Sequence, residues 1–189
     1  LWNTTIETTQ NGTATSYAVG VFDNAALKLS RFFQKNLRNK DVRIEITIDR
    51  SRMLLQGIAN GIFDICISII PEEKITTQNI ILVKTFYETL VPVSGRRWIE
   101  DPESIPFILY NKGSETRHYI DKTFLRQSIV PNIVVESTDP GFMKELAMGS
   151  CGVALLQRNF VARELEQKKL IEQNLPFKFS RRVGVFIRK

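Results

Sequence analysis

The side chains that could carry out catalysis are few in this sequence and form no recognisable set. The single histidine, His118, falls within a stretch of helical periodicity, and no Ser–His–Asp arrangement accompanies it. No His and Cys cluster has metal-ligand spacing, and no glycine-rich loop is of the kind that holds phosphates. The sequence therefore predicts no catalytic residue, no metal site and no cofactor, in a protein that is not an enzyme.

The two cysteines, Cys66 and Cys151, each lie within an apolar stretch. This pattern is typical of reduced core residues in a cytosolic protein, because disulfides persist mainly in oxidising compartments. The alternative is a thiol redox switch, which requires exposed cysteines in electropositive surroundings. The sequence favours the structural interpretation.

The chain carries an excess of positive charge in scattered small groups. It has 26 Lys and Arg against 20 Asp and Glu, a formal charge of +6, without a stripe of base-stacking aromatics beside them. We therefore expect solvated surface charge rather than nucleic-acid binding by this segment. No apolar run reaches the length of a bilayer span and no signal-like segment opens the chain, so we expect a cytoplasmic protein without a membrane partner.

The periodicity of apolar residues predicts alternating strands and helices that would position a binding site. Residues 1–16 are polar and Thr-rich, which predicts a tether. Strands are predicted at 17–22, 42–48, 64–70, 105–110, 133–135, 152–156 and 183–187, and helices from Asn24 and at 51–60, 114–127, 140–148 and 160–166. Residues 80–93 are predicted to form two extended stretches that are broken near Tyr87 and Glu88. This alternation indicates α/β architecture with parallel sheets and right-handed crossovers.

The pattern starts again near Asp101, which predicts two α/β lobes in series. Lobe I takes residues 17–88 and 177–189, lobe II takes residues 89–176, and the chain crosses between them near 87–90 and 175–180. We expect two separate sheets that face each other across a hinged crevice. Ligands of open parallel sheets bind beyond the carboxyl ends of the strands, where helix N-termini point their N–H groups.

Three segments, in this order, resemble parts of LysR-type effector domains. They are residues 54–67 with Gly61 and Asp64, residues 113–124 with Ser114 and Arg117, and residues 136–156 with Met143, Gly149 and Gly152. The chain departs from the family pattern at Gln157, where the family usually has a proline.

The resemblance implies the sensing half of a LysR-type transcription regulator, with two Rossmann-like lobes and a hinge as in type II periplasmic binding proteins. It implies a small-molecule effector in the cleft, homodimers that pair side by side and antiparallel, and a tetramer at full length. The helix from Leu27 to Leu37 is a plausible dimer face. Because the chain begins at Leu1 rather than Met, we expect that a piece upstream is missing, and the resemblance implies that this piece is a helix-turn-helix that binds DNA. The alternatives are a periplasmic solute-binding protein of a transporter and an interaction module without a ligand.

The candidate ligand-binding residues lie mostly in loops that precede helices. By the resemblance, the loop after the first strand lines the effector pocket, and Thr138 occupies a position that touches ligand in the family. Asp23 or Asn24 could equally cap a helix, and Ser51 could cap the helix that it opens. The full set of candidates is Phe22, Asp23, Asn24, Ser51, Ser68, Lys112, Ser114 and Thr138.

Overall fold

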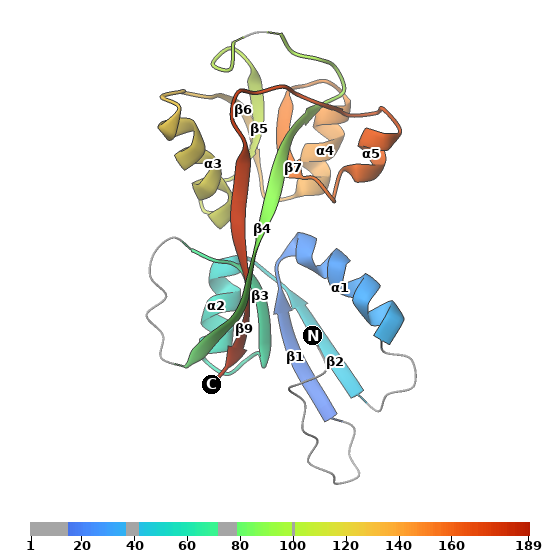
Figure 1. Ribbon diagram of the computed structural model, residues 1–189, viewed down its shortest axis with the longest axis vertical. Coiled ribbons are helices and arrows are strands. Elements are labelled where there is room, and N and C mark those ends of the chain that lie inside the picture. Colours follow the sequence, from blue (N-terminus) through green and yellow to red (C-terminus); the bar gives the residue numbers. More distant parts are fainter. Residues whose placement is uncertain (1–14, 37–41, 72–78, 100) are drawn as a thin grey trace.

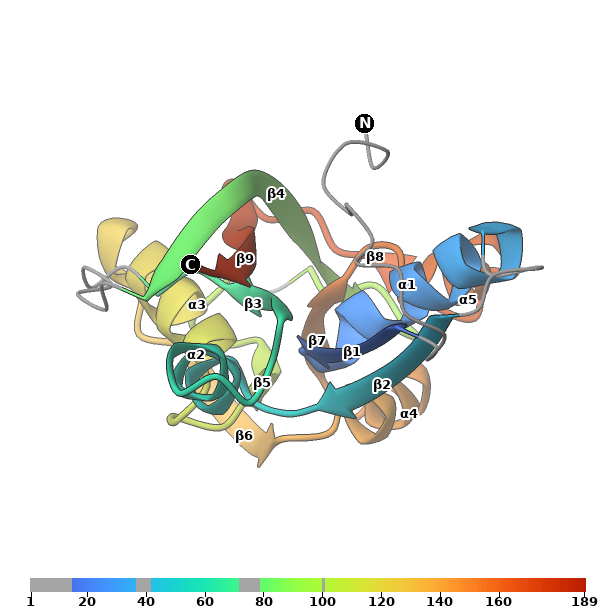
Figure 2. The same cartoon turned by 90° about the horizontal axis from the view of Figure 1, so that it is seen from below.

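The computed structural model describes residues 15–36, 42–71, 79–99 and 101–189. Two lobes lie end to end, and two long strands run through both of them (Figure 1). Seen from below, along the long axis, the two lobes overlap (Figure 2). The predicted tether lies outside the described residues except for Thr15 and Ser16, which belong to the first strand.

Lobe I is built from three parallel strands, as predicted. They are β1 (Thr15–Val21), β2 (Val42–Ile48) and β3 (Ile65–Ile69), in the order β2-β1-β3, and they are connected by α1 (Asp23–Asn36) and α2 (Ser51–Ala59). The α2 helix buries Leu54 and Ile58, one turn apart on the same face. The chain then turns at Gly61, whose φ of 77° is a left-handed conformation that glycine adopts without steric cost.

Lobe II repeats the strand–helix alternation. It contains β5 (Pro106–Tyr110), α3 (Glu115–Arg126), β6 (Asn132–Ser137), α4 (Pro140–Met148), β7 (Val153–Gln157), α5 (Ala162–Glu166) and the short β8 (Ile171–Glu172). The parallel strands follow the order β7-β5-β6. All of these elements were predicted except β8, whose two residues pair with the end of a neighbouring strand.

The two long strands, β4 (Ile80–Ser94) and β9 (Phe179–Arg188), are antiparallel and paired along most of their length. The predicted break near Tyr87 and Glu88 is therefore wrong. Instead, β4 is continuous through the junction between the lobes. A charged residue does not interrupt the strand here because Glu88 lies directly opposite Arg181 on β9. The predicted separation into two sheets is also wrong, since β3 pairs with β9 and β7 pairs with β4, which joins all strands into one curled sheet.

Each lobe nevertheless has its own hydrophobic core. The core of lobe I includes Val21, Leu54 and Ile58, and the core of lobe II includes Phe107 and Phe124. The long strands change from one core to the other. On β4 the change falls between Phe86 and Leu90, and on β9 it falls between Phe179 and Val183. Within the described residues, β4 and β9 are the strands that pass from one core to the other, so the two-lobed molecule can hinge at these crossings.

Candidate functional site

The junction between the lobes holds a buried ion pair at the point where β4 and β9 cross. The Nη2 atom of Arg181 donates to Oε2 of Glu88 at 2.9 Å, and its Nε donates to the same oxygen at 3.2 Å. Each side chain is only 2% exposed. An ion pair removed from water is costly unless its remaining donors and acceptors are also satisfied, so its neighbours decide whether it is tolerated.

Three further residues surround this ion pair, and they come from both lobes. Gln157, at the end of β7, donates its amide hydrogen to Glu88. Thr116, in the first turn of α3, accepts from Nη1 of Arg181. The ring of Phe22, which follows β1 in lobe I, lies 4.9 Å from the Arg181 guanidinium carbon, within cation–π range. We name these five residues (Phe22, Glu88, Thr116, Gln157 and Arg181) the crossing cluster.

A second contact links α3 to lobe I beside the crossing cluster. The hydroxyl of Tyr119 donates to the carbonyl oxygen of Ile70, directly after β3, at 2.8 Å. The carboxyl ends of β3 and β7 and the first turns of α3 therefore meet at the junction, which is the arrangement that binds ligands in open α/β sheets.

The orientation of α3 is fixed by a buried arginine that follows Thr116. Arg117 donates to Asp121 at 2.6 Å, to the carbonyl oxygen of Tyr110 at 2.8 Å, and to Glu136 on β6. Burial disfavours the charged guanidinium, but the hydrogen bonds to Glu136 and Asp121 outweigh it and raise the pKa of Arg117. The bond from Arg117 in turn lowers the pKa of Glu136. These contacts hold the N-terminus of α3 against β5 and β6.

The candidate residues of lobe I differ in their surroundings. Phe22 is buried in the crossing cluster. The α1 helix begins at Asp23, and the side chains of Asp23 and Asn24 lie outside the described part of the structure. Ser51 does not cap α2, because Arg50 occupies the cap position.

Ser51 and Ser68 are both buried and hydrogen-bonded within lobe I. The Ser51 hydroxyl oxygen accepts from the backbone N–H of Ile69 at 3.2 Å. The Ser68 hydroxyl lies 3.2 Å from the carbonyl oxygens of Ser51 and Ile69 and can donate to either. These two serines join the start of α2 to the end of β3.

The candidate residues of lobe II lie at helix N-termini. Ser114 caps α3 by accepting from the N–H of Arg117 at 3.0 Å. Lys112, in the preceding turn, is exposed. Thr138 is exposed as well and does not begin a helix as expected, because Asp139 caps α4 by accepting from Gly141 at 2.6 Å. A carboxylate with two backbone donors within reach makes Asp139 the natural cap.

Sequence reasoning missed four members of the crossing cluster: Glu88, Thr116, Gln157 and Arg181. Two signals could have pointed to them. Glu88 is the one acidic residue of its strand and lies between Tyr87 and Thr89, and Gln157 stands where the family pattern usually has a proline. Arg181 and Thr116 carry no local signal, since their partners lie 93 and 65 residues away along the chain.

Two other kinds of site find no support in the described residues. None of the His, Cys, Asp and Glu side chains described gathers in a group of three that could hold a metal ion. Within the same part of the chain, no helix has the length and apolar character to cross a membrane.

A model of the LysR substrate binding domain family matches residues 19–189. The chain belongs to this family. The LysR-type domain is thus the sensing part of a transcription regulator, which agrees with the expectation from sequence and favours it over a transporter's solute-binding protein. No relative was found among curated protein sequences.

Solved structures of LysR-type regulators share the fold. The regulatory domain of HypT from Salmonella typhimurium with bromide bound has a TM-score of 0.78 and 16% identity, over 95% of this chain and 88% of that one. The effector binding domain of QuiR in complex with shikimate has a TM-score of 0.72 and 14% identity, over 94% and 88%. DarR of Vibrio fischeri in complex with DNA has a TM-score of 0.73 and 17% identity, over 91% of this chain and 61% of DarR. At such identities the similarity establishes the fold, that of type II periplasmic binding proteins.

Proposed function

We propose that this LysR-type domain binds a small metabolite between its lobes, beside the crossing cluster. The observation that carries the proposal is the composition of that cluster. Its side chains come from lobe I, from lobe II and from both strands that connect them. A ligand that touches these residues touches both lobes at their hinge, and QuiR, which shares the fold, is described in complex with shikimate at its effector binding domain.

The contacts to the ligand come from exposed and cluster residues together. Thr138, Lys112 and Ser114 supply hydroxyl and ammonium groups from lobe II. Phe22 and the start of α1, where Asp23 and Asn24 stand, supply the facing wall from lobe I. The Thr116 hydroxyl oxygen accepts a hydrogen bond from Arg181. In this proposal the hydroxyl therefore acts as a hydrogen-bond donor to the ligand. Ser51 and Ser68 form hydrogen bonds within lobe I. In this proposal, a serine that binds the ligand replaces one of these internal hydrogen bonds by a hydrogen bond to the ligand.

The ligand acts by changing the relative populations of open and closed lobes. It can shift that equilibrium only as far as its affinities for the two states differ. Because β4 and β9 are the two strands that pass between the cores, closure of the lobes changes the backbone conformation where these strands cross. We propose that closure changes how two copies pair, and so repositions a DNA-binding helix-turn-helix upstream of this chain in a cytoplasmic regulator. DarR, which shares the fold, is described in complex with DNA.

Pairing of two copies is proposed for the side of lobe I that carries α1 and β2. Leu29, Phe32 and Phe33 of α1 are half-buried, and β2 is an edge strand whose Ile46 and Ile48 are 42% and 55% exposed. Exposed apolar residues on an edge strand favour an interface. We therefore propose that the domain forms a homodimer and that the full-length protein forms a tetramer. The proposal includes no catalytic step.

The experiment that tests the proposal combines a ligand screen with one substitution. Thermal-shift screening of this chain against organic acids, amino acids and sugars identifies a ligand, whose affinity is then measured by calorimetry. We expect Thr138→Val to weaken binding about tenfold, the cost of one lost hydrogen bond, and to leave the melting temperature of the free chain unchanged.

The matched control is Thr85→Val, which makes the same change at an exposed position on β4 within lobe I. It leaves the affinity as it was. Equal affinity for Thr138→Val and the unsubstituted chain would remove Thr138 from the site. Failure of every compound to shift the melting temperature would favour an interaction module without a ligand.

A further inference from the structure

One side chain of lobe II packs against the core of lobe I. It is Tyr119 of α3, and among the described residues of lobe II it is the one that packs there. Its neighbours on the same helix, Ile120 and Phe124, are instead buried in the core of lobe II. Helix α3 therefore divides its apolar side chains between the two lobes, although it belongs to lobe II.

The hydroxyl of Tyr119 connects the same side chain to the backbone of lobe I. It donates to the carbonyl oxygen of Ile70 at 2.8 Å. Ile70 is 6% exposed, and its own N–H donates to the carbonyl oxygen of Arg182 on β9 at 2.9 Å. The acceptor is thus fixed to the sheet of lobe I. Tyr119 joins the lobes by an apolar and a polar contact together, and we call the pair of Tyr119 and Ile70 the interlobe latch.

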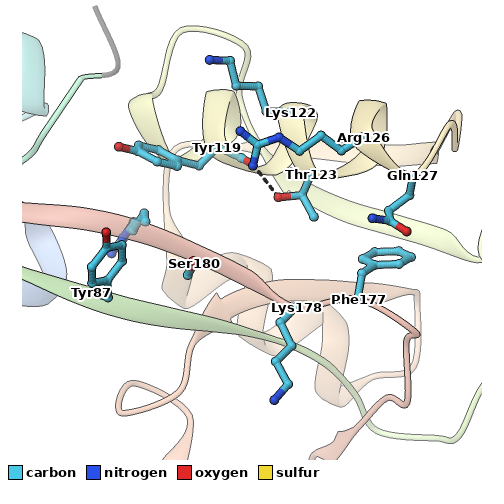
Figure 3. A pocket seen from close by; sticks show the side chains of 10 residues that line it. Tyr87, Tyr119, Lys122, Thr123, Arg126, Gln127, Phe177, Lys178 and Ser180 are labelled. Atoms are coloured by element: carbon cyan, nitrogen blue, oxygen red, sulfur yellow. Dashed lines mark hydrogen bonds between the residues drawn. The ribbon is translucent and has the colours of Figure 1, made fainter.

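The backbone of Tyr119 is fixed in lobe II. Figure 3 shows its side chain extending from α3, while its carbonyl oxygen accepts from the hydroxyl of Thr123 at 2.9 Å. Two residues before Tyr119, Arg117 donates to the carbonyl oxygen of Tyr110 on β5 and to Glu136 on β6. These bonds hold the helix to the sheet of lobe II, so Tyr119 moves with lobe II when the lobes change their relative position.

The interlobe latch lies away from the crossing of the long strands. Thr116, which accepts from Arg181 at the crossing, precedes Tyr119 by three residues and lies on the same face of α3. Tyr119 is therefore about one helical turn, or about 5 Å, further along the axis of α3. Since donor and acceptor more than about 3.5 Å apart no longer form a hydrogen bond, a rotation that moves Tyr119 by about 1 Å breaks its bond to Ile70.

We propose that the interlobe latch sets the balance between two arrangements of the lobes. It stabilises the arrangement described here, and Tyr119 must release Ile70 before the lobes take up the other one. This inference rests on the lobe movement of the proposed function, and it assigns to Tyr119 a positioning role that acts through the lobes rather than through contact with an effector. Loss of one neutral hydrogen bond changes such a balance about fivefold.

The test measures the distance between the lobes by pulsed electron paramagnetic resonance, without added ligand. One nitroxide is attached to the native Cys151, which is exposed on lobe II, and the other to Gln56→Cys, at an exposed position of α2 in lobe I. Cys66 is buried and stays unlabelled. We expect Tyr119→Phe, which keeps the ring and removes the hydroxyl, to raise the share of a second interlobe distance about fivefold. Tyr119→Ala raises it further, because it also removes the ring.

The matched control is Tyr87→Phe, which makes the same change at a tyrosine of β4 that is 72% exposed. It leaves the distribution of interlobe distances unchanged. Identical distributions for Tyr119→Phe and the unsubstituted chain would overturn the proposal, and so would an equal change in Tyr87→Phe. Either result leaves the effector site standing, because the ligand screen and Thr138→Val test that site separately. A second distance in Tyr119→Phe supports the interlobe latch even where the screen finds no ligand.

Discussion

The guanidinium of Arg181 explains how a charged pair can be buried where two lobes meet. Its Nε and Nη2 atoms bond to Glu88, and its Nη1 bonds to Thr116. Glu88 receives a further bond from Gln157. A buried network is stable when its members satisfy one another and costly when one is missing. The same bonds tie β4, β9, β7 and α3 together, so a change at any of them is transmitted to the others.

The two cysteines should differ sharply in reactivity. Burial raises the pKa of the Cys66 thiol to about 12, so at pH 8 it stays protonated and unreactive, since the thiolate is the nucleophile. Cys151 is exposed in the turn between α4 and β7. We expect an aromatic disulfide reagent to modify one thiol rapidly in the native chain, and the second only after denaturant is added.

The variants Cys151→Ser and Cys66→Ala identify the thiol that reacts. Rapid modification is lost in Cys151→Ser and retained in Cys66→Ala. Two rapidly reacting thiols in the native chain would contradict the buried placement of Cys66, and would reopen the redox interpretation of that residue.

The strands β4 and β9 stabilise the junction between the lobes. The contribution of the Glu88–Arg181 pair to the free energy of unfolding can be measured directly. We expect Glu88→Gln to lower the free energy of unfolding by about 3 kcal/mol, because it leaves a buried guanidinium without its counter-charge. The double variant Glu88→Leu, Arg181→Met should lose less, because it removes both charges and keeps the volume. Its remaining loss comes from the hydrogen bonds of Gln157 and Thr116. Urea denaturation measures both.

The matched control for this prediction is an exposed ion pair of the same residue types. Arg158 and Glu172 approach to 2.5 Å, with side chains 51% and 41% exposed. Glu172→Gln should cost about 1 kcal/mol or less, because water screens the pair. Equal losses for Glu88→Gln and Glu172→Gln would show that the crossing cluster contributes no more to stability than a surface pair does.

Short elements could be predicted from the sequence because their signals are local. The strict alternation from Val42 to Ile48 and the spacing of Leu54 and Ile58 correctly predicted β2 and α2. The long strands could not be predicted in the same way. Continuity of β4 through Glu88 depends on Arg181, 93 residues later. The return of the chain to lobe I near residues 175–180 was predicted, but no local signal pairs these two residues. The joining of the sheets depends on the same return of β9.

The residues of the candidate site also differ in whether a local sequence signal marks them. Ser114 and Phe22 could be placed near the junction because Phe22 ends a predicted strand and Ser114 begins a predicted helix. Thr138 was assigned to a helix start that Asp139 occupies, because two adjacent cap-forming residues compete and sequence alone does not rank them. The crossing cluster forms only when both lobes are assembled, so its members become neighbours only in the fold.

The whole molecule combines two hydrophobic cores with a narrow connection. Each lobe buries its own set of apolar side chains, and β4 and β9 are the strands that pass from one set to the other. Relative movement of the lobes then requires changes at the crossing and at contacts such as Tyr119 to Ile70, while the cores stay as they are. This architecture suits a domain in which ligand binding at the junction is converted into a change of shape.

The most direct measurement of this account is a crystal structure of the chain with a metabolite found by the thermal-shift screen. We predict electron density for the ligand between the lobes, in contact with at least one residue of each and with Thr116, Gln157 or Thr138. A ligand held entirely by one lobe, with no contact to the crossing cluster or to the helix N-termini that face it, would contradict the account.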